Sequence, residues 1–202
     1  MNRIETIADL EALYGESPPA SIAKETPVIN SAYRRLIEAA PFCSIASIGE
    51  EGMDCSPRGD GPGFVHILDD RTIAIADRRG NNRLDTLRNI VSDPRVALLF
   101  LIPGWNEALR INGRAYVSND LDLLKSFDVN GNSPATAIVV EIDTMYFQCA
   151  RAIKRAKLWD ADALVPLDQL PKAGELIQSV MADFDAAEYD GALQERQAKT
   201  LY

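Results

Sequence analysis

Positive charge is concentrated in one stretch of the chain, between Ile75 and Phe100. Five arginines fall in this stretch: Arg78, Arg79, Arg83, Arg88 and Arg95. The whole chain of 202 residues is acidic, with a formal net charge of -9. A local group of cations in an acidic protein is typical of a site for an anion. The sequence therefore predicts an anion-binding site here.

The arginines lie at a predicted passage from a strand into a helix. The strand ends at Ala76 and Asp77, and the helix is expected to begin at Asn81 or Asn82. The first turn of a helix presents unpaired N–H groups and a partial positive charge, which suit a phosphate. Arg83 would be repelled there unless it faced an anion. We therefore expect Arg83 to bind a phosphate, and Asn82 either to cap the helix or to donate a hydrogen bond to the same anion.

The other arginines of the stretch are interpreted differently. Arg78 is equally consistent with a contact to the anion and with a solvated loop charge. Arg79, Arg88 and Arg95 are expected to be solvated or paired, with Asp85 or Asp93 as the partner of Arg88.

Two further polar groups are candidates for the same ligand. Arg110 and Asn112 alternate with apolar residues, so their side chains share one face of a strand. That face is either solvated or turned toward the hydrogen-bonding edge of a planar cofactor. Arg155 belongs to a second cationic cluster with Arg151, Lys154 and Lys157, of which one or two are expected to be solvated.

Several other chemistries are not expected. The glycines of "RGDGPG" precede a strand rather than a helix, so they predict a hairpin connection and not a dinucleotide-binding loop. His66 is the only histidine and lies among apolar residues, which indicates a structural role. With one histidine and no closely spaced cysteine pair, no metal site is predicted. No catalytic residue is identified.

Composition predicts one globular domain over residues 1–202, with 47% hydrophobic residues. The acidic pI of about 4.7 argues against nucleic acid and anionic membranes as partners. The sequence has no apolar run approaching about 20 residues, so no membrane span is expected. The amphipathic, charged start is unlike a signal peptide. The cytoplasm is the predicted compartment.

Apolar periodicity predicts helices near both ends and strands between them. Helices are expected at 4–14, 28–40, 81–93 and 121–127, with a Pro- and Ser-rich connector at 15–27. Leu84, Leu87, Ile90 and Val91 are expected to share one helix face. Strands are expected at 42–49 and 53–59, in two paired segments within 63–77, and at 95–102, 107–118 and 136–150, with 95–102 buried on both faces. After Asp160 the chain is predicted to be helical, with an apolar stripe of Leu176, Ile177, Val180, Met181 and Phe184. These elements predict a mainly β protein with peripheral helices, a small antiparallel barrel of about six strands.

The chain resembles the FMN-binding split-barrel proteins related to pyridoxamine 5'-phosphate oxidase. The resemblance runs from "CSIASIG" to "INGRAYVS" and returns at "CARAIKRAKLW". It implies a homodimer with FMN at the subunit interface. By position, Ser56, Pro57 and Arg58 would lie along the flavin, and Ala76 and Asp77 would end the strand beneath it. Arg78, which follows that strand, is a further candidate for a contact with the cofactor. Arg110 would approach the ring beside Asn112, and Arg155 would come from the partner or the substrate side.

The sequence also departs from the oxidase. The early strand reads "MDCSPRG", where the oxidase has a flanking arginine and lysine, and "KRAKLW" contains no histidine. Pyridoxamine phosphate is therefore not the expected substrate. The prediction is an FMN-dependent oxidoreductase for another small molecule, with NADH or NADPH as a candidate reductant. The alternative is a barrel that binds a flavin or another anion without catalysis.

Overall fold

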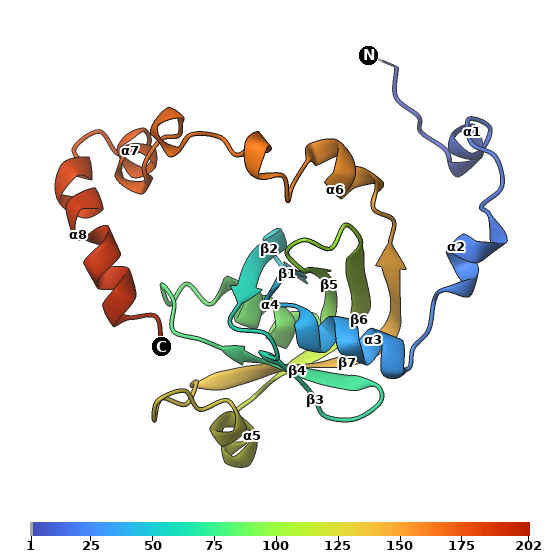
Figure 1. Cartoon of the computed structure of the whole chain (residues 1–202), viewed down its shortest axis with the longest axis horizontal. Helices are drawn as coiled ribbons and strands as arrows, with labels where there is room; N and C mark the ends of the chain where they lie inside the picture. Colours follow the sequence, from blue (N-terminus) through green and yellow to red (C-terminus); the bar gives the residue numbers. More distant parts are fainter. Residues whose placement is uncertain (1) are drawn as a thin grey trace.

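The computed structural model describes residues 2–202 and is built on one antiparallel sheet (Figure 1). Seven strands follow the order β2-β1-β5-β6-β7-β4-β3. Their bounds are β1 Phe42–Gly49, β2 Gly52–Gly59, β3 Val65–Ile67, β4 Thr72–Asp77, β5 Arg95–Leu101, β6 Ala108–Ser118 and β7 Thr136–Gln148. The mainly β class with helices around it is confirmed. The strands number seven rather than about six, and within residues 2–202 the edge strands β2 and β3 do not pair, so the sheet stays open.

Local sequence explains the hairpins. Burial alternates along β1 and β2, which pair in register from Phe42–Gly59 to Gly49–Gly52. Gly52 supplies the positive φ of 115° at the turn, a conformation that glycine adopts without a Cβ clash. Strands β3 and β4 form the second predicted pair, with Val65 opposite Ile75.

The sheet has an inner face, which carries the main core. Cys43 and Ile45 of β1, Leu98 and Phe100 of β5, and Ile111 of β6 are buried there. Helices α3 (Ser31–Ala39) and α4 (Asp85–Ser92) cover this face. A smaller cluster lies on the other side of β4 and β7, against α5 (Leu121–Ser126). Strand β4 is therefore buried on both sides, as the run "TIAIA" suggests.

The opposite surface of β1, β5 and β6 is here called the outer face. The register aligns Ser44 with Leu99 and Leu99 with Arg110 on it, and places Phe42 beside Leu101. The prediction that 95–102 is buried on both faces is wrong, because Leu99 is 38% exposed while Leu98 is 1% exposed. The segment is apolar on both faces, but within a single chain only one of these faces is covered.

Helix bounds differ from the predictions at three places. The first helix is shorter, α1 Ile7–Glu11, and the predicted connector contains α2 Pro19–Ala23, where a proline occupies the first turn. Helix α4 begins at Asp85 rather than at Asn81 or Asn82. Its predicted apolar face is also partly wrong, since Ile90 is buried but Val91 is 77% exposed.

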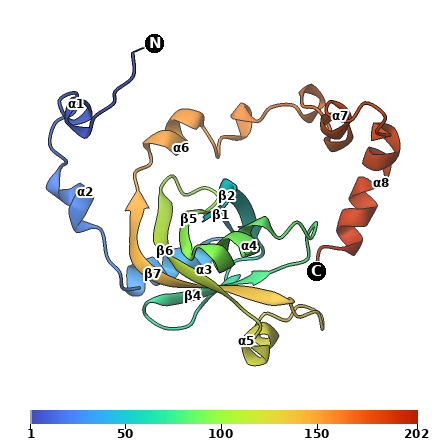
Figure 2. The same cartoon turned by 180° about the vertical axis from the view of Figure 1, so that it is seen from behind.

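The two ends of the chain form arms that leave the sheet (Figures 1 and 2). The C-terminal arm, residues 150–202, contains α6 Arg151–Ala156, α7 Ala173–Gln178 and α8 Ala186–Lys199, with short 3-10 turns at Ala161–Ala163 and Leu167–Gln169. The predicted apolar stripe does not form one helix face, because Val180, Met181 and Phe184 lie between α7 and α8. Within residues 2–202, no helix combines the length and apolar character needed to cross a membrane.

The bulge between β6 and β7 generates a stability prediction. At Gly113 the register shifts, and a Cβ on this residue would lie 2.1 Å from the Glu141 carbonyl oxygen. A backbone atom in a paired strand cannot move aside at low cost. We expect Gly113→Ala to lower the free energy of unfolding by about 2 kcal/mol or more, measured by urea denaturation. Gly15→Ala is the matched control, since nothing lies within 4 Å of its Cβ position. Equal stability of the two variants would contradict this account of the bulge.

Candidate functional site

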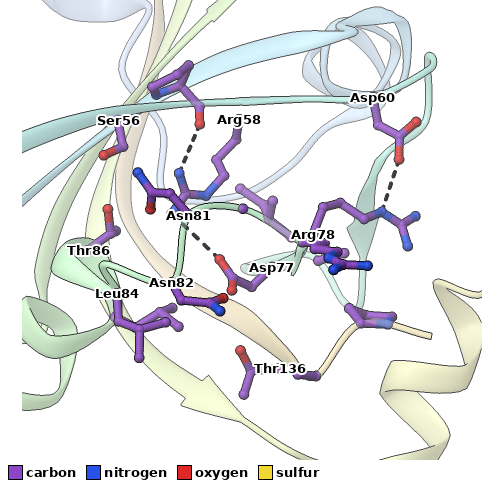
Figure 3. Close-up of a pocket in the computed structure, with 18 of the residues that line it drawn as sticks. Ser56, Arg58, Asp60, Asp77, Arg78, Asn81, Asn82, Leu84, Thr86 and Thr136 are labelled. Atoms are coloured by element: carbon purple, nitrogen blue, oxygen red, sulfur yellow. Dashed lines mark hydrogen bonds and ion pairs between the residues drawn. The ribbon is translucent and has the colours of Figure 1, made fainter. Parts of the chain in front are cut away.

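A pocket of about 1010 Å³ opens between β2, the end of β4 and the start of α4 (Figure 3). Eight residues predicted to bind the cofactor line it: Ser56, Pro57, Arg58, Ala76, Asp77, Arg78, Asn82 and Arg83. Three others lie elsewhere. Arg110 and Asn112 are on the outer face, where Arg110 Nε donates to Asn112 Oδ1 at 3.2 Å, and Arg155 is exposed on α6.

The wall formed by β2 is tied to α4 through a carboxylate. Asp54 Oδ2 accepts hydrogen bonds from the Ser56 hydroxyl and from the Thr86 hydroxyl, both at 3.0 Å. Thr86 is buried in the first turn of α4. The bond from Thr86 fixes the start of the helix against the strand, while the bond from Ser56 holds the Asp54 carboxylate in place. A second link, from Asn89 Nδ2 to Ser47 Oγ at 3.1 Å, holds the helix farther along.

The loop that enters α4 is strained. Asn82 and Leu84 both have left-handed backbone conformations, with φ of 57° and 61°. A leucine in this region costs on the order of 1 kcal/mol or more, and such strain often accompanies functional sites. Leu84 is the N-cap residue and its side chain cannot accept a hydrogen bond. The prediction that Asn82 caps the helix or lies in its first turn is therefore wrong.

The first turn of α4 consequently meets the pocket without a side-chain cap. Leu84, Asp85, Thr86 and Leu87 all line the pocket. The N–H groups of this turn have no acceptor within the helix. They leave hydrogen-bond donors at the pocket wall, beside Asn82 and Arg83. The end of a helix is thus available to an anion, although it starts later than predicted.

Three pocket arginines are paired with carboxylates. Arg58 lies 3.7 Å from Asp77, Arg78 lies 3.1 Å from Asp60, and Arg83 lies 2.8 Å from Asp85. The first two pairs are largely buried, whereas Arg83 is 73% exposed and free to change rotamer. Arg95 pairs with Asp93, one of the two outcomes expected for it. Among residues 2–202, Arg88 forms no ion pair with either predicted aspartate.

Two buried polar atoms in the pocket wall have no partner within residues 2–202. These are Nε of Arg58 and Oγ1 of Thr136. Buried donors and acceptors are nearly always satisfied, so an unsatisfied pair at a pocket indicates a polar ligand. Both residues are labelled in Figure 3, where the Arg58 side chain extends from β2 toward Asp77.

A cluster around Arg78 closes one side of the pocket. The Arg78 guanidinium also donates to the Phe127 carbonyl at 2.8 Å and lies 5.5 Å from the centre of the Tyr202 ring. The Tyr202 hydroxyl donates to Asp60 at 2.8 Å. His66 stacks on Phe127 and contacts Ser126, as expected of a structural histidine. No sequence pattern indicates a role for Tyr202, because its contact with Asp60 joins residues 142 positions apart.

The aspartates of the pocket differ in acidity. Burial raises the pKa of Asp77 above its usual value, and the nearby charge of Arg58 only partly opposes this. Burial would also raise the pKa of Asp60, but hydrogen bonds from Tyr202 and Gly61 and the charge of Arg78 together lower it. Asp60 is therefore a stable anion that holds Arg78, whereas Asp77 is the more readily protonated carboxylate.

The raised pKa of Asp77 predicts a pH dependence of stability. Below its ordinary value of 3.8 the carboxyl is protonated in both folded and unfolded chains. As the pH rises through its higher folded pKa, the buried charge destabilises the folded state. Relative to Asp77→Asn, the wild-type free energy of unfolding should fall across this window and then level off. Urea midpoints at a series of pH values measure it. A difference that moves the opposite way would show that Arg58 outweighs burial.

Within residues 2–202, no group of three or more histidine, cysteine, aspartate or glutamate side chains is arranged to hold a metal ion. The site is instead built from arginine, aspartate, amide and hydroxyl groups. Its chemistry suits an organic ligand with an anionic end and several hydrogen-bonding groups.

Solved structures whose backbones align with this chain have low sequence identity to it. HupZ from Group A Streptococcus is 14% identical with a TM-score of 0.49, covering 59% of this chain and 93% of HupZ. General stress protein 26 from Bacillus anthracis is 16% identical with a TM-score of 0.44, covering 57% and 89%. An F420 reductase is 18% identical with a TM-score of 0.42, covering 58% and 98%.

No curated protein sequence matches the chain. The sequence model of one family, described as pyridoxamine 5'-phosphate oxidase, matches residues 29–149. The match covers more than half of the chain and includes all seven strands and every pocket residue except Tyr202. The chain therefore belongs to the pyridoxamine 5'-phosphate oxidase family.

Proposed function

We propose that this protein binds FMN in the pocket between β2, β4 and α4 and acts as an oxidoreductase on a small molecule. The observation that carries the proposal is the uncapped start of α4 at the pocket, next to Asn82 and Arg83. This arrangement suits a terminal phosphate, since helix N–H groups and a guanidinium both bind phosphate oxygens. Family membership supports the same assignment.

The remaining pocket suits the rest of the cofactor. Its volume of about 1010 Å³ is at the upper end of the range for small-molecule sites. The unpartnered atoms of Arg58 and Thr136 would hydrogen-bond polar groups of the ligand. Asp77 and Asp60 would accept from its hydroxyl or N–H groups. An inorganic anion alone would leave most of these groups unused, and the carboxylates would repel it.

The charge pairs also explain why an acidic protein can hold an anionic cofactor. Arg58 and Arg78 are held in place by Asp77 and Asp60, so the pocket is preorganised while its net charge stays small. Arg83 has a weaker hold, because its pair with Asp85 is exposed to solvent. Exchange of Asp85 for a phosphate would therefore cost little. Arg83 is the residue we expect to respond most to the ligand.

A bound flavin supplies the electron-transfer chemistry, and the protein binds and tunes it. In this proposal Asn82, Arg83 and the first turn of α4 bind the phosphate. Ser56, Pro57, Arg58, Ala76, Asp77 and Arg78 orient the remainder. Arg110, Asn112 and Arg155 lie outside the pocket, so their proposed contacts would come from the second copy in a homodimer. Pyridoxamine phosphate is not proposed as the substrate, and the cytoplasm is the proposed compartment.

Replacement of Arg83 tests the phosphate assignment. Loss of one charge-assisted hydrogen bond costs about 1.5–3 kcal/mol, so Arg83→Ala should weaken FMN binding roughly 10-fold or more. Riboflavin lacks the phosphate, and its affinity should change little. Fluorescence titration measures both ligands.

Arg34→Ala is the matched control, because Arg34 pairs with Glu38 on the exposed side of α3, away from the pocket. It should leave the affinity for both ligands unchanged. An unchanged affinity of Arg83→Ala for FMN, or an equal loss for FMN and riboflavin, would refute the assignment of Arg83 to the phosphate.

Reduction of the bound cofactor separates an enzyme from a flavin-binding module without catalysis. We expect NADH or NADPH to bleach the flavin absorbance of the holoprotein in the absence of oxygen, faster than it bleaches free FMN. The control is the same protein with dithionite, which reduces the flavin chemically. Reduction by dithionite but by neither nicotinamide would remove NAD(P)H from the proposal and favour the binding module.

A further inference from the structure

The arms leave a large apolar surface uncovered. In the C-terminal arm, Leu164, Val165, Leu167, Leu170, Leu176, Val180 and Met181 are all at least 49% exposed. The N-terminal segment before α3 adds exposed Ile4, Ile7, Leu13 and Tyr14. Exposed apolar residues gathered on one segment mark an interaction surface. These arms lie outside residues 29–149, the part that matches the family model.

The total accessible surface of the chain indicates how much area an interface with another copy could bury. The protein exposes 13939 Å². A compact monomer of 22.2 kDa would expose about 9,400 Å², which is roughly 4,500 Å² less. Obligate dimers bury on the order of 1,000–2,500 Å² on each chain. The excess is therefore large enough to supply the interface of a permanent dimer.

The sheet carries a second uncovered surface, its outer face. Phe42 and Leu99 are each 38% exposed there, with Ala46, Ala97 and Leu101 between and beside them. Helices α3 and α4 cover only the inner face. The same chain thus has an apolar arm and a sheet face with an apolar part, around Phe42, Leu99 and Leu101, and these two surfaces do not cover one another. A two-fold dimer would cover both surfaces, because the arm of each copy would meet the outer face of its partner.

We propose that the C-terminal arm of one copy packs against the outer face of a second copy. Figures 1 and 2 show the arm arching away from its own sheet and returning at the end of the chain. It returns at the pocket, where Tyr202 bonds to Asp60. In this dimer the second copy lies between α6, where the arm begins, and the pocket of the first copy, where the arm ends. This inference rests on the homodimer of the proposed function and adds the segment that holds it together.

Charge substitutions in the arm test the proposal by mass in solution. Light scattering should give a dimer for the wild type and a shift toward monomer for Leu167→Asp combined with Val180→Asp. Gln169→Glu combined with Gln194→Glu adds the same charge at exposed polar positions of the arm and should remain dimeric. A dimer unaffected by the aspartates would overturn the arm's role. A monomeric wild type would overturn the homodimer as well.

Crosslinking on the wild-type background gives an independent readout that does not depend on a destabilising variant. A benzophenone amino acid at Val180 is photolysed in a mixture of ¹⁴N- and ¹⁵N-labelled protein exchanged to equilibrium. We expect mixed-isotope peptide pairs that join the arm to 42–49, 95–101 or 108–118. Crosslinks confined to one copy, or between copies but away from these strands, would overturn the proposal. FMN titration of the same samples reports separately on the proposed function.

Discussion

The hydrogen bond from Thr86 to Asp54 is the interaction on which the site depends. It joins the first turn of α4 to β2 at 3.0 Å, and Thr86 is almost completely buried. Without it, the helix start and the strand that carries Ser56 and Arg58 would not share a pocket. The chain accepts left-handed strain at Asn82 and Leu84 to bring the helix to this position. The buried contacts of α4 with β1 and β6 offset that strain.

Paired charges then define what the pocket can bind. Isolated arginines would attract any anion, and isolated buried carboxylates would be costly. The pairs Arg58–Asp77 and Arg78–Asp60 avoid both outcomes, and each partner keeps the other in place. The exposed pair Arg83–Asp85 is the weakest of the three, and it stands where the uncapped helix offers its N–H groups. A ligand with one strongly anionic end and a polar body suits this graded arrangement.

Short-range pattern was enough to predict most of the sheet. The short strand-like segment "FCSIASIG" and the turn that follows it predict the first hairpin, because strand preference and turn conformation are both local properties. The start of α4 was not predictable in this way. Two asparagines before an apolar periodic segment are typical of a helix cap, yet the left-handed backbone at Asn82 and Leu84 prevents a helix from starting before Asp85. The pairs Arg58–Asp77 and Arg78–Asp60, and the contact of Tyr202 with Asp60, depend equally on long-range packing.

The apolar pattern of a strand also did not predict which of its faces is buried within a single chain. The run "RVALLFLI" is apolar on both faces, but only one face is covered here, and Leu99 remains exposed. An apolar strand predicts that both faces meet something, whether that is the same chain or a second copy. We propose that the pocket binds a phosphorylated flavin. Titration of the purified protein with FMN, followed by flavin fluorescence, checks this proposal. Saturable binding of one FMN per chain, weakened by inorganic phosphate, is expected. A protein that binds no FMN would contradict it.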